Sequence, residues 1–139
     1  MTFDEIFKKE STKFTTRPYY NDDGSTASAS YWLCNTCEYL AEVLEIITKN
    51  PEIEIAEAST NGYEVTLKKH HGFMLRTMFY GFFKALAPYR VDVCAQLHPR
   101  GDSPELLQEV EQFIAVIRPL VARVRAENPR WAEFLASEA

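Results

Sequence analysis

Cys34 and Cys37 are the residues whose types and spacing could most directly do chemistry. They lie three positions apart near the start of a segment with a helical pattern, and the free amides and positive dipole of a helix N-terminus stabilise a thiolate. That arrangement is typical of a redox-active thiol pair. The alternative is that Cys37 is a small apolar residue of the core and that Cys34 lies at its flank. We favour this alternative, because a cysteine pair without a preceding strand is a weak signal.

The same segment resembles the active-site segment of the thioredoxin family over about one helix. Trp32 stands just before the cysteine pair, as the resemblance requires. It implies thiol–disulfide exchange at Cys34 and Cys37. The sequence departs from the family's pattern in two ways, because Leu33 separates the tryptophan from the first cysteine and residues 25–30 do not form a buried strand.

A zinc site is a further alternative for these cysteines. Thiolate and imidazole are the ligands that zinc prefers in structural sites. Such a site would combine the pair with ligands from later segments: Cys34, Cys37, His70 and Cys94. A second close pair of ligands is missing, so we expect no metal ion and no other cofactor.

No set of catalytic residues stands out. His70 and His71 follow two lysines and fit an exposed turn. A catalytic role would require a nucleophile and a carboxylate that converge on them, and no feature of the sequence places such groups there. Gly-rich phosphate loops and the HExxH and GxSxG motifs are absent. We therefore predict no catalytic residue and a protein that is not an enzyme.

Aromatic and basic side chains are concentrated in residues 73–89. If this stretch is a helix, several of them lie at the edge of the buried arc or outside it. Tyrosine, phenylalanine, methionine and arginine together are typical of protein-binding surfaces. The residues expected to form this surface are Phe73, Arg76, Tyr80, Phe83, Lys84 and Tyr89. The alternative is that the N-terminal arm covers them within the domain.

The charge balance limits the partners. A formal net charge of −5 over 139 residues repels phosphate, so we expect neither nucleic-acid nor membrane binding. We interpret four arginines near the C-terminus as partners of glutamates and of a helix dipole: Arg118, Arg123, Arg125 and Arg130. No apolar run approaches the ~20 residues of a transmembrane helix, and the first residues do not resemble a secretory signal. The chain has 3 cysteines, an odd number, which favours reduced thiols over a set of disulfides. Together these features predict a soluble cytoplasmic protein.

The cysteine pair must be positioned by a helix over residues 30–50. Its polar side chains fall in one narrow strip and its apolar arc is wider than one packing partner needs, so this helix belongs inside a layered domain. Further helices are expected over residues 2–9 and from Pro104 and Pro129, each with a capping residue before its first turn. Residues 73–87 fit a helix better than a strand.

Three segments alternate apolar and polar residues with the period of a strand. Residues 52–58 and 63–69 flank Asn61 and Gly62, which favour a tight turn, so they predict a β-hairpin. Residues 90–97 predict a third strand. The expected fold is therefore α+β, with a small mainly antiparallel sheet of three or four strands packed against the central helix and the C-terminal helices.

The length predicts a single globular domain over residues 1–139, with a polar arm at residues 11–29 that we expect to be mobile. The predicted function is non-enzymatic protein binding, as in an inhibitor, an immunity protein or an adaptor. The partner would be another protein, which could be basic because the chain is acidic, or a second copy in a homo-oligomer. The alternative function is that of a small thiol-dependent redox or zinc-binding protein that uses Cys34 and Cys37.

Overall fold

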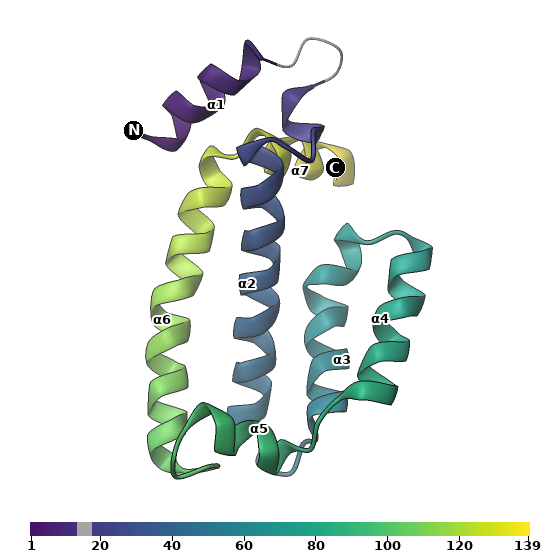
Figure 1. Ribbon diagram of the computed structural model, residues 1–139, viewed down its shortest axis with the longest axis vertical. Helices are drawn as coiled ribbons and strands as arrows, with labels where there is room; N and C mark the ends of the chain where they lie inside the picture. The colour runs from purple at the N-terminus through teal and green to yellow at the C-terminus, as the bar shows by residue number, and fades with distance from the viewer. Residues whose placement is uncertain (14–17) are drawn as a thin grey trace. The chain divides into compact units, whose positions relative to one another are not determined.

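The regular structure of this protein is helical. A computed structural model describes residues 1–13 and 18–139, and within these ranges it contains helices and 3-10 turns but no strand. Figure 1 shows the helices along the chain. The predicted α+β fold with an antiparallel sheet is therefore wrong. None of the described helices is both long enough and apolar enough to span a bilayer.

The chain divides into two compact units. The terminal unit contains Met1–Cys37 and Pro119–Ala139, and the middle unit contains Glu38–Arg118. Helices α2 (Thr26–Lys49) and α6 (Pro104–Glu127) each contribute residues to both units. Each unit has packing of its own.

The terminal unit also contains α1 (Phe3–Ser11), the 3-10 turn η1 (Tyr19–Asn21) and α7 (Pro129–Glu138). The capping box expected at the first helix is present, with the amide of Glu5 donating to Thr2 Oγ1 at 3.2 Å. Asn128 caps α7 and donates hydrogen bonds to Ala27 O and Ser30 Oγ, both at 2.9 Å. It therefore holds the start of α7 against α2.

Helix α2 begins at Thr26, whereas the sequence pattern predicted a start at residue 30. Ser25 Oγ accepts a hydrogen bond from the amide of Ser28 at 3.0 Å, and Glu10 of α1 accepts one from the amide of Thr26 at 2.8 Å. These acceptors satisfy amides that a helix N-terminus leaves without partners. The last part of the predicted arm at 11–29 is thus helical, and residues 14–17 of that arm lie outside the described residues.

The middle unit adds α3 (Ile55–Val65), the 3-10 turn η2 (Leu67–His70), α4 (Phe73–Leu86) and α5 (Arg90–Leu97). One core cluster joins α2 and α3 and consists of Val43, Ile47, Ile55 and Ala58. A second joins α5 and α6 and consists of Cys94, Leu106 and Val110. The helix favoured over residues 73–87 is confirmed as α4, which continues through Gly81.

The hairpin prediction is wrong, because the residues assigned to it form α3 followed by η2. The buried residues of α3 recur at helical spacing: Ile55, Ala58, Ser59, Gly62 and Tyr63. Gly62 does not form a turn. It lets α3 approach α2, because a Cβ atom at this position would lie 2.7 Å from Val43 Cγ2. Val65, expected on the buried side of a strand, is 62% exposed.

The predicted strand over residues 90–97 is helix α5. Arg90 and Cys94, which the alternating pattern placed on the partly solvated side, are buried one helical turn apart. Val91, which the pattern placed in the core, is 70% exposed. The sequence interpretation placed Arg90 on the solvated side, because charged side chains are buried only when they are paired. The structure buries Arg90.

Arg90 is buried because it binds the backbone at the end of α2. Its guanidinium group donates hydrogen bonds to the carbonyl oxygens of Ile47 at 3.0 Å and Asn50 at 3.1 Å. The last carbonyls of a helix have no partners within the helix, so this contact stabilises the end of α2. Asp102 compensates the charge, with its carboxylate 2.8 Å from Arg90 Nε.

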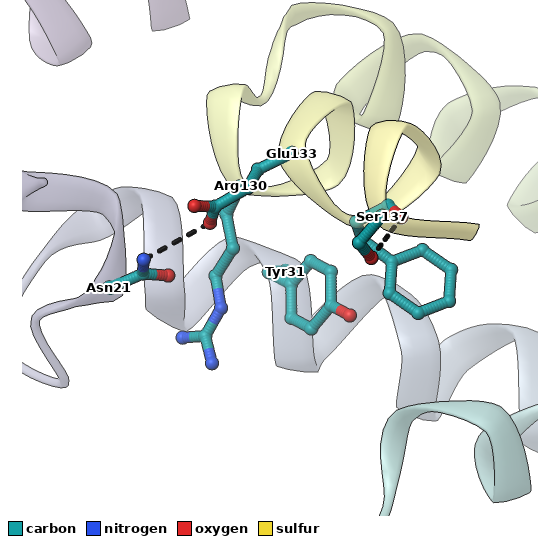
Figure 2. A pocket seen from close by; sticks show the side chains of 6 residues that line it. Asn21, Tyr31, Arg130, Glu133 and Ser137 are labelled. Carbon is teal, nitrogen blue, oxygen red and sulfur yellow. Dashed lines mark hydrogen bonds between the residues drawn. The ribbon is translucent and has the colours of Figure 1, made fainter. Parts of the chain in front are cut away.

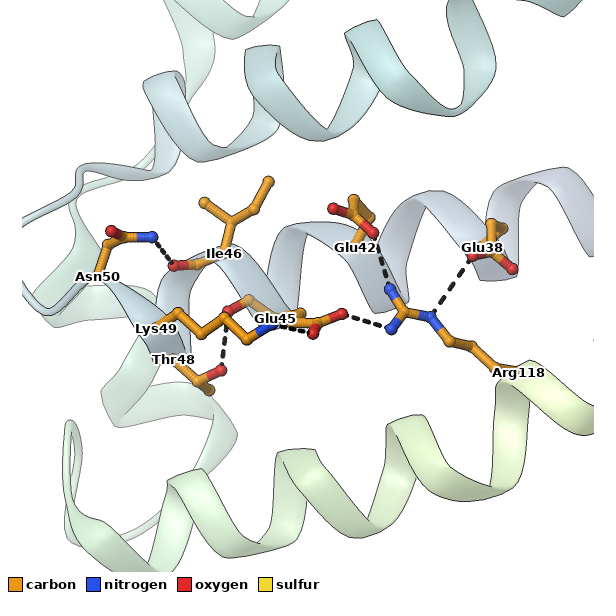
Figure 3. Close-up of polar contacts among 8 residues, drawn as sticks. All are labelled: Glu38, Glu42, Glu45, Ile46, Thr48, Lys49, Asn50 and Arg118. Carbon is orange, nitrogen blue, oxygen red and sulfur yellow. Dashed lines mark hydrogen bonds and ion pairs between the residues drawn. The ribbon is translucent and has the colours of Figure 1, made fainter.

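Arg118 links α6 to the polar strip of α2 inside the middle unit (Figure 3). Its guanidinium group contacts Glu38 at 3.5 Å, Glu42 at 2.7 Å and also Glu45. Hydrogen bonds from Lys49 and Arg118 lower the pKa of Glu45. The strip is therefore an ion-pair network that joins two helices.

Candidate functional site

A cluster of aromatic side chains joins α3 to α4 in the middle unit. Tyr63 is fully buried at its centre. Its ring stacks on Phe79, with ring centres 5.2 Å apart, and meets Phe83 edge-on at 5.6 Å. Tyr39 of α2 stacks on Phe83 at 6.1 Å. Aromatic pairs at these distances stabilise a core beyond the burial of their area, so this cluster holds one side of α4 in place.

A buried hydrogen bond connects the cluster to His71, the residue that follows η2. The hydroxyl of Tyr63 lies 3.0 Å from Nδ1 of His71, and both side chains are buried. Burial lowers the pKa of His71, and the positive charge of Arg76 lowers it further. The imidazole is therefore neutral near pH 7. The pair places an uncharged polar group inside an apolar environment.

Arg76 fixes the connection between η2 and α4. Its Nε donates hydrogen bonds to the carbonyl oxygens of His71 at 2.8 Å and Lys68 at 3.0 Å. The guanidinium group thus satisfies backbone acceptors of its own unit. This contact keeps the first turn of α4 in a defined orientation.

The other side of α4 is apolar and exposed. No residue of this helix is buried, although most of its residues are large and apolar. Four of them recur at three- and four-residue steps along one line and are 42% to 68% exposed: Leu75, Met78, Phe82 and Leu86. We call this line the apolar face of α4. At the start of the helix, Phe73 is 87% exposed and Met74 is 76% exposed. Exposed apolar surface of this kind marks an interaction site.

The six residues predicted to form one binding surface point in two directions. Three are exposed: Phe73, Lys84 and Tyr89. Three are half-buried toward α3 and η2: Arg76, Tyr80 and Phe83. The hydroxyl of Tyr80 donates a hydrogen bond to Glu64 of α3. The structure therefore does not bring the six together, because the five on α4 are distributed around the helix at 100° per residue and Tyr89 lies beyond its end, before α5.

The sequence analysis did not single out Tyr63, and it placed His71 in an exposed turn. Both errors come from the predicted hairpin, which separated the two side chains. The helical spacing of Ser59, Gly62 and Tyr63 is the signal that could have identified this buried face.

The cysteines do not form a reactive site. Helix α2 begins about two turns before Cys34, so its thiol is not at the helix N-terminus. Burial raises the pKa of Cys34, which the positive charge of Arg125 offsets in part, and burial also raises the pKa of Cys94. Among the described residues, no group of three or more histidine, cysteine or acidic side chains is placed to hold a metal ion, and this applies to the alternative zinc set of Cys34, Cys37, His70 and Cys94.

Comparisons with known proteins give a consistent result. The profile of the family described as Glycolipid transfer protein (GLTP) matches residues 1–99. Glycolipid transfer protein 2 of Arabidopsis thaliana is 26% identical over 121 residues, which are 86% of this chain and 52% of that protein. The chain thus spans about half the length of this curated relative. The crystal structure of HET-C2, a fungal glycolipid transfer protein, matches with a TM-score of 0.64 at 21% identity, over 90% of this chain and 70% of that chain. This likeness shows the fold.

These similarities test the functional predictions. The matching family consists of lipid transfer proteins and not of enzymes, so the expectation of a non-enzymatic protein is confirmed. The interpretation as an inhibitor, immunity protein or adaptor is wrong, and so is the alternative of a redox or zinc protein that uses Cys34 and Cys37. The expected protein partner, basic or a second copy, is contradicted by the same matches. The physical reason is that exposed apolar side chains on a helix suit a lipid as well as a protein surface.

Proposed function

Because this chain belongs to the glycolipid transfer protein family, we propose that it binds a glycolipid and carries it through water between membranes. The observation that supports this proposal is the apolar face of α4. Its four side chains stay exposed, although the helix is held in place on its other side by the aromatic cluster. A rigid apolar surface open to the solvent is what a carrier needs to receive a hydrocarbon chain.

The chemistry of the face favours a lipid chain. Leu75, Met78, Phe82 and Leu86 offer neither a charge nor a hydrogen-bonding group, so they match a ligand that has none. Each CH₂ group that such a face removes from water contributes about 0.8 kcal/mol to binding. Covering a chain of several CH₂ groups would therefore stabilise the complex and remove the exposed patch at the same time.

The start of α4 is the part that we expect to meet a membrane. The exposed side chains of Phe73 and Met74 can enter the interface between headgroups and acyl chains. Two residues separate them from η2, and η2 carries Lys68, which is paired with Glu64, and Lys69, whose positive charge anionic headgroups attract. This proposal replaces the expectation, drawn from the net charge, that the protein avoids membranes. Charges act on a surface within about 10 Å in 0.1 M salt, so the local charge matters more than the total.

We place this activity in the cytoplasm. The three cysteines Cys34, Cys37 and Cys94 are free. Thiols of this kind persist in a reducing compartment, where structural disulfides are rare.

A vesicle assay tests the function. Donor vesicles of phosphatidylcholine would contain a fluorescent galactosylceramide, and the appearance of the lipid in acceptor vesicles would be followed with time. We expect the wild-type protein to accelerate transfer. Phe82→Glu should reduce the rate about tenfold or more, because a carboxylate on the apolar face must be desolvated when a lipid chain covers it.

The matched control is Thr77→Glu, which adds the same charge to an exposed position of α4 outside the apolar face. It should transfer glycolipid at nearly the wild-type rate. Circular dichroism would verify that both variants remain helical. Normal transfer by Phe82→Glu would contradict the role of this face, and a wild-type protein without transfer would contradict the function itself.

A further inference from the structure

The side chain of His71 bridges α3 and α4 at the place where the chain passes from η2 into α4. Only 8% of this residue is exposed, and its Nδ1 lies 3.0 Å from the hydroxyl of Tyr63 in α3. The imidazole ring also contacts Phe79 of α4, with ring centres 4.8 Å apart. His71 is therefore a buried titratable group that contacts both helices.

The first turn of α4 depends on the side chains around it, because it has no side-chain cap of its own. Gly72 is the N-cap residue and cannot accept a hydrogen bond from the free amides of this turn. The next two residues, Phe73 and Met74, are exposed. His71 precedes the N-cap, and its side chain connects this end of the helix to α3. Loss of that contact would therefore let the first turn move.

A positive charge on the His71 ring would have an unfavourable environment. Burial lowers its pKa, and the charge of Arg76 on α4 lowers it further, because both oppose protonation. Arg76 is held near His71 by the hydrogen bond of 2.8 Å from its Nε to the carbonyl oxygen of His71. The carboxylate of Glu64 in α3 is bonded to Lys68 in η2 and to the hydroxyl of Tyr80 in α4. A protonated ring would thus be a buried charge beside a guanidinium group, which costs free energy.

An exposed polar pair in the terminal unit shows the opposite case. Figure 2 shows Asn21, whose Nδ2 donates a hydrogen bond of 3.1 Å to the carboxylate of Glu133. Glu133 is exposed, so water solvates its charge and no part of the chain has to move for that. The ring of His71 is buried, so a proton bound there gains hydration only when the ring leaves its site.

From this arrangement we infer that His71 is a proton-operated latch: the neutral ring holds the start of α4 against α3, and the protonated ring leaves its site and releases that start. The released segment carries Phe73 and Met74, the side chains that we expect to meet a membrane. On the basis of the proposed function, opening the latch strengthens membrane binding, because a mobile apolar segment and an imidazolium group both reach the interface.

An anionic membrane favours the open state of the latch. The surface potential of a cytoplasmic leaflet, about −30 mV, raises the local proton concentration about threefold. The latch therefore opens more readily at such a surface than in the surrounding water. The pH of the whole compartment does not have to change for this response.

Amide hydrogen exchange tests the latch in the absence of lipid. The reporter is the amide of Arg76, which donates a hydrogen bond of 3.1 Å to Gly72 O in the first turn of α4. Its protection factor compares the exchange rate with that of an unstructured peptide at the same pH. The released ring titrates at the ordinary imidazole pKa of about 6.5, so lowering the pH from 7 to 5.5 should reduce this factor by up to about eightfold.

The matched amide is that of Val93, which donates a hydrogen bond of 3.2 Å to Tyr89 O in the first turn of α5. Its local opening does not involve His71, so its protection should stay within about twofold. An equal loss at both amides would show a general loosening of the unit and would overturn the latch.

The chain has 3 histidines that titrate in this pH range, so variants identify the one responsible. His71→Gln should abolish the loss of protection, because glutamine is polar but does not titrate. His70→Gln and His98→Gln are the matched controls and should retain the loss. Tyr63→Phe keeps the aromatic ring and removes the hydroxyl, so it should lower the protection of the Arg76 amide about fivefold already at pH 7. A pH response that persists in His71→Gln, or unchanged protection in Tyr63→Phe, would overturn the latch.

Vesicle binding tests the consequence for the membrane. The fraction of wild-type protein that sediments with phosphatidylcholine vesicles should rise as the pH falls from 7 to 5.5, and His71→Gln should not show this rise. Phosphatidylserine in the vesicles should move the midpoint of the rise to higher pH by about half a unit. Hydrogen exchange that shows opening without any rise in vesicle binding would overturn the role of the latch at the membrane. A protein that shows both responses but transfers no glycolipid would overturn the proposed function and leave the latch supported.

Discussion

Helices α3 and α4 pack side by side in the middle unit, and their apolar residues have different surroundings (Figure 1). Helix α3 buries five residues, among them Gly62 and Tyr63, against α2 and α4. Helix α4 contains more large apolar side chains, yet none of its residues is buried. The comparison teaches that apolar content does not by itself predict burial. The apolar residues of α3 stabilise the fold, whereas those of α4 remain available for a ligand.

Truncating an aromatic residue in each helix should produce the largest difference. Tyr63→Ala removes the fully buried centre of the cluster, and we expect it to lower the free energy of unfolding by about 3–5 kcal/mol. Phe82→Ala removes a side chain that is 49% exposed, and it should lower that free energy by less than about 1 kcal/mol. Urea unfolding followed by circular dichroism would measure both. Similar losses in the two variants would contradict the division of roles between the helices.

Replacing the glycine in each of the two helices should change the free energy of unfolding by an intermediate amount, and the two changes should have opposite signs. Gly62→Ala would place a Cβ atom 2.7 Å from Val43 Cγ2, so overpacking should destabilise the protein by about 1–3 kcal/mol. A Cβ atom at Gly81 meets no atom within 4 Å, so Gly81→Ala should stabilise α4 by about 0.5–1 kcal/mol through helix propensity. Melting temperatures of the two variants would move in opposite directions. A stabilising Gly62→Ala would show that α3 does not approach α2 closely.

The smallest expected effect is a pH dependence of the free energy of unfolding, which comes from His71, the buried partner of Tyr63 in α3. The pKa of His71 in the folded protein is lower than its ordinary value of 6.5, so below that pH the unfolded chain binds more protons than the folded one. The free energy of unfolding should therefore fall as the pH drops from about 6.5 through the folded pKa, and it should recover when the pH is raised.

Unfolding in urea at pH 7 and pH 5.5 would measure this decline. His71→Gln should flatten it, because the buried ring no longer titrates. His70→Gln should keep it, since the decline belongs to the histidine that is bonded to Tyr63. Both carboxylates whose pKa is lowered, Glu45 and Glu64, contribute only at lower pH, because they remain ionised until the pH falls below their ordinary value of 4.5.

Part of the site could be predicted from sequence. The stretch over residues 73–87 was correctly interpreted as a helix with exposed aromatic side chains, because its pattern of large apolar residues is strong and local. The ligand that we propose for it could not be predicted, because a lipid chain is recognised by apolar area and not by a motif of polar residues.

The sequence by itself determined the helices that have clear local signals. Thr2 and Asn128 cap α1 and α7 as expected, and the long apolar pattern of α2 is helical. These features depend on residues within one or two turns, so a single sequence contains the information needed.

Only the tertiary structure decided that α3 and α5 are helices. Asn61 and Gly62 suit a tight turn and a closely packed helix equally, and the contact between Gly62 and Val43 selects the helix. Arg90 suits a solvated position until the carbonyls at the end of α2 and the carboxylate of Asp102 surround it. In both segments the deciding partner is distant along the chain, so the local pattern favoured a strand and the packing overruled it.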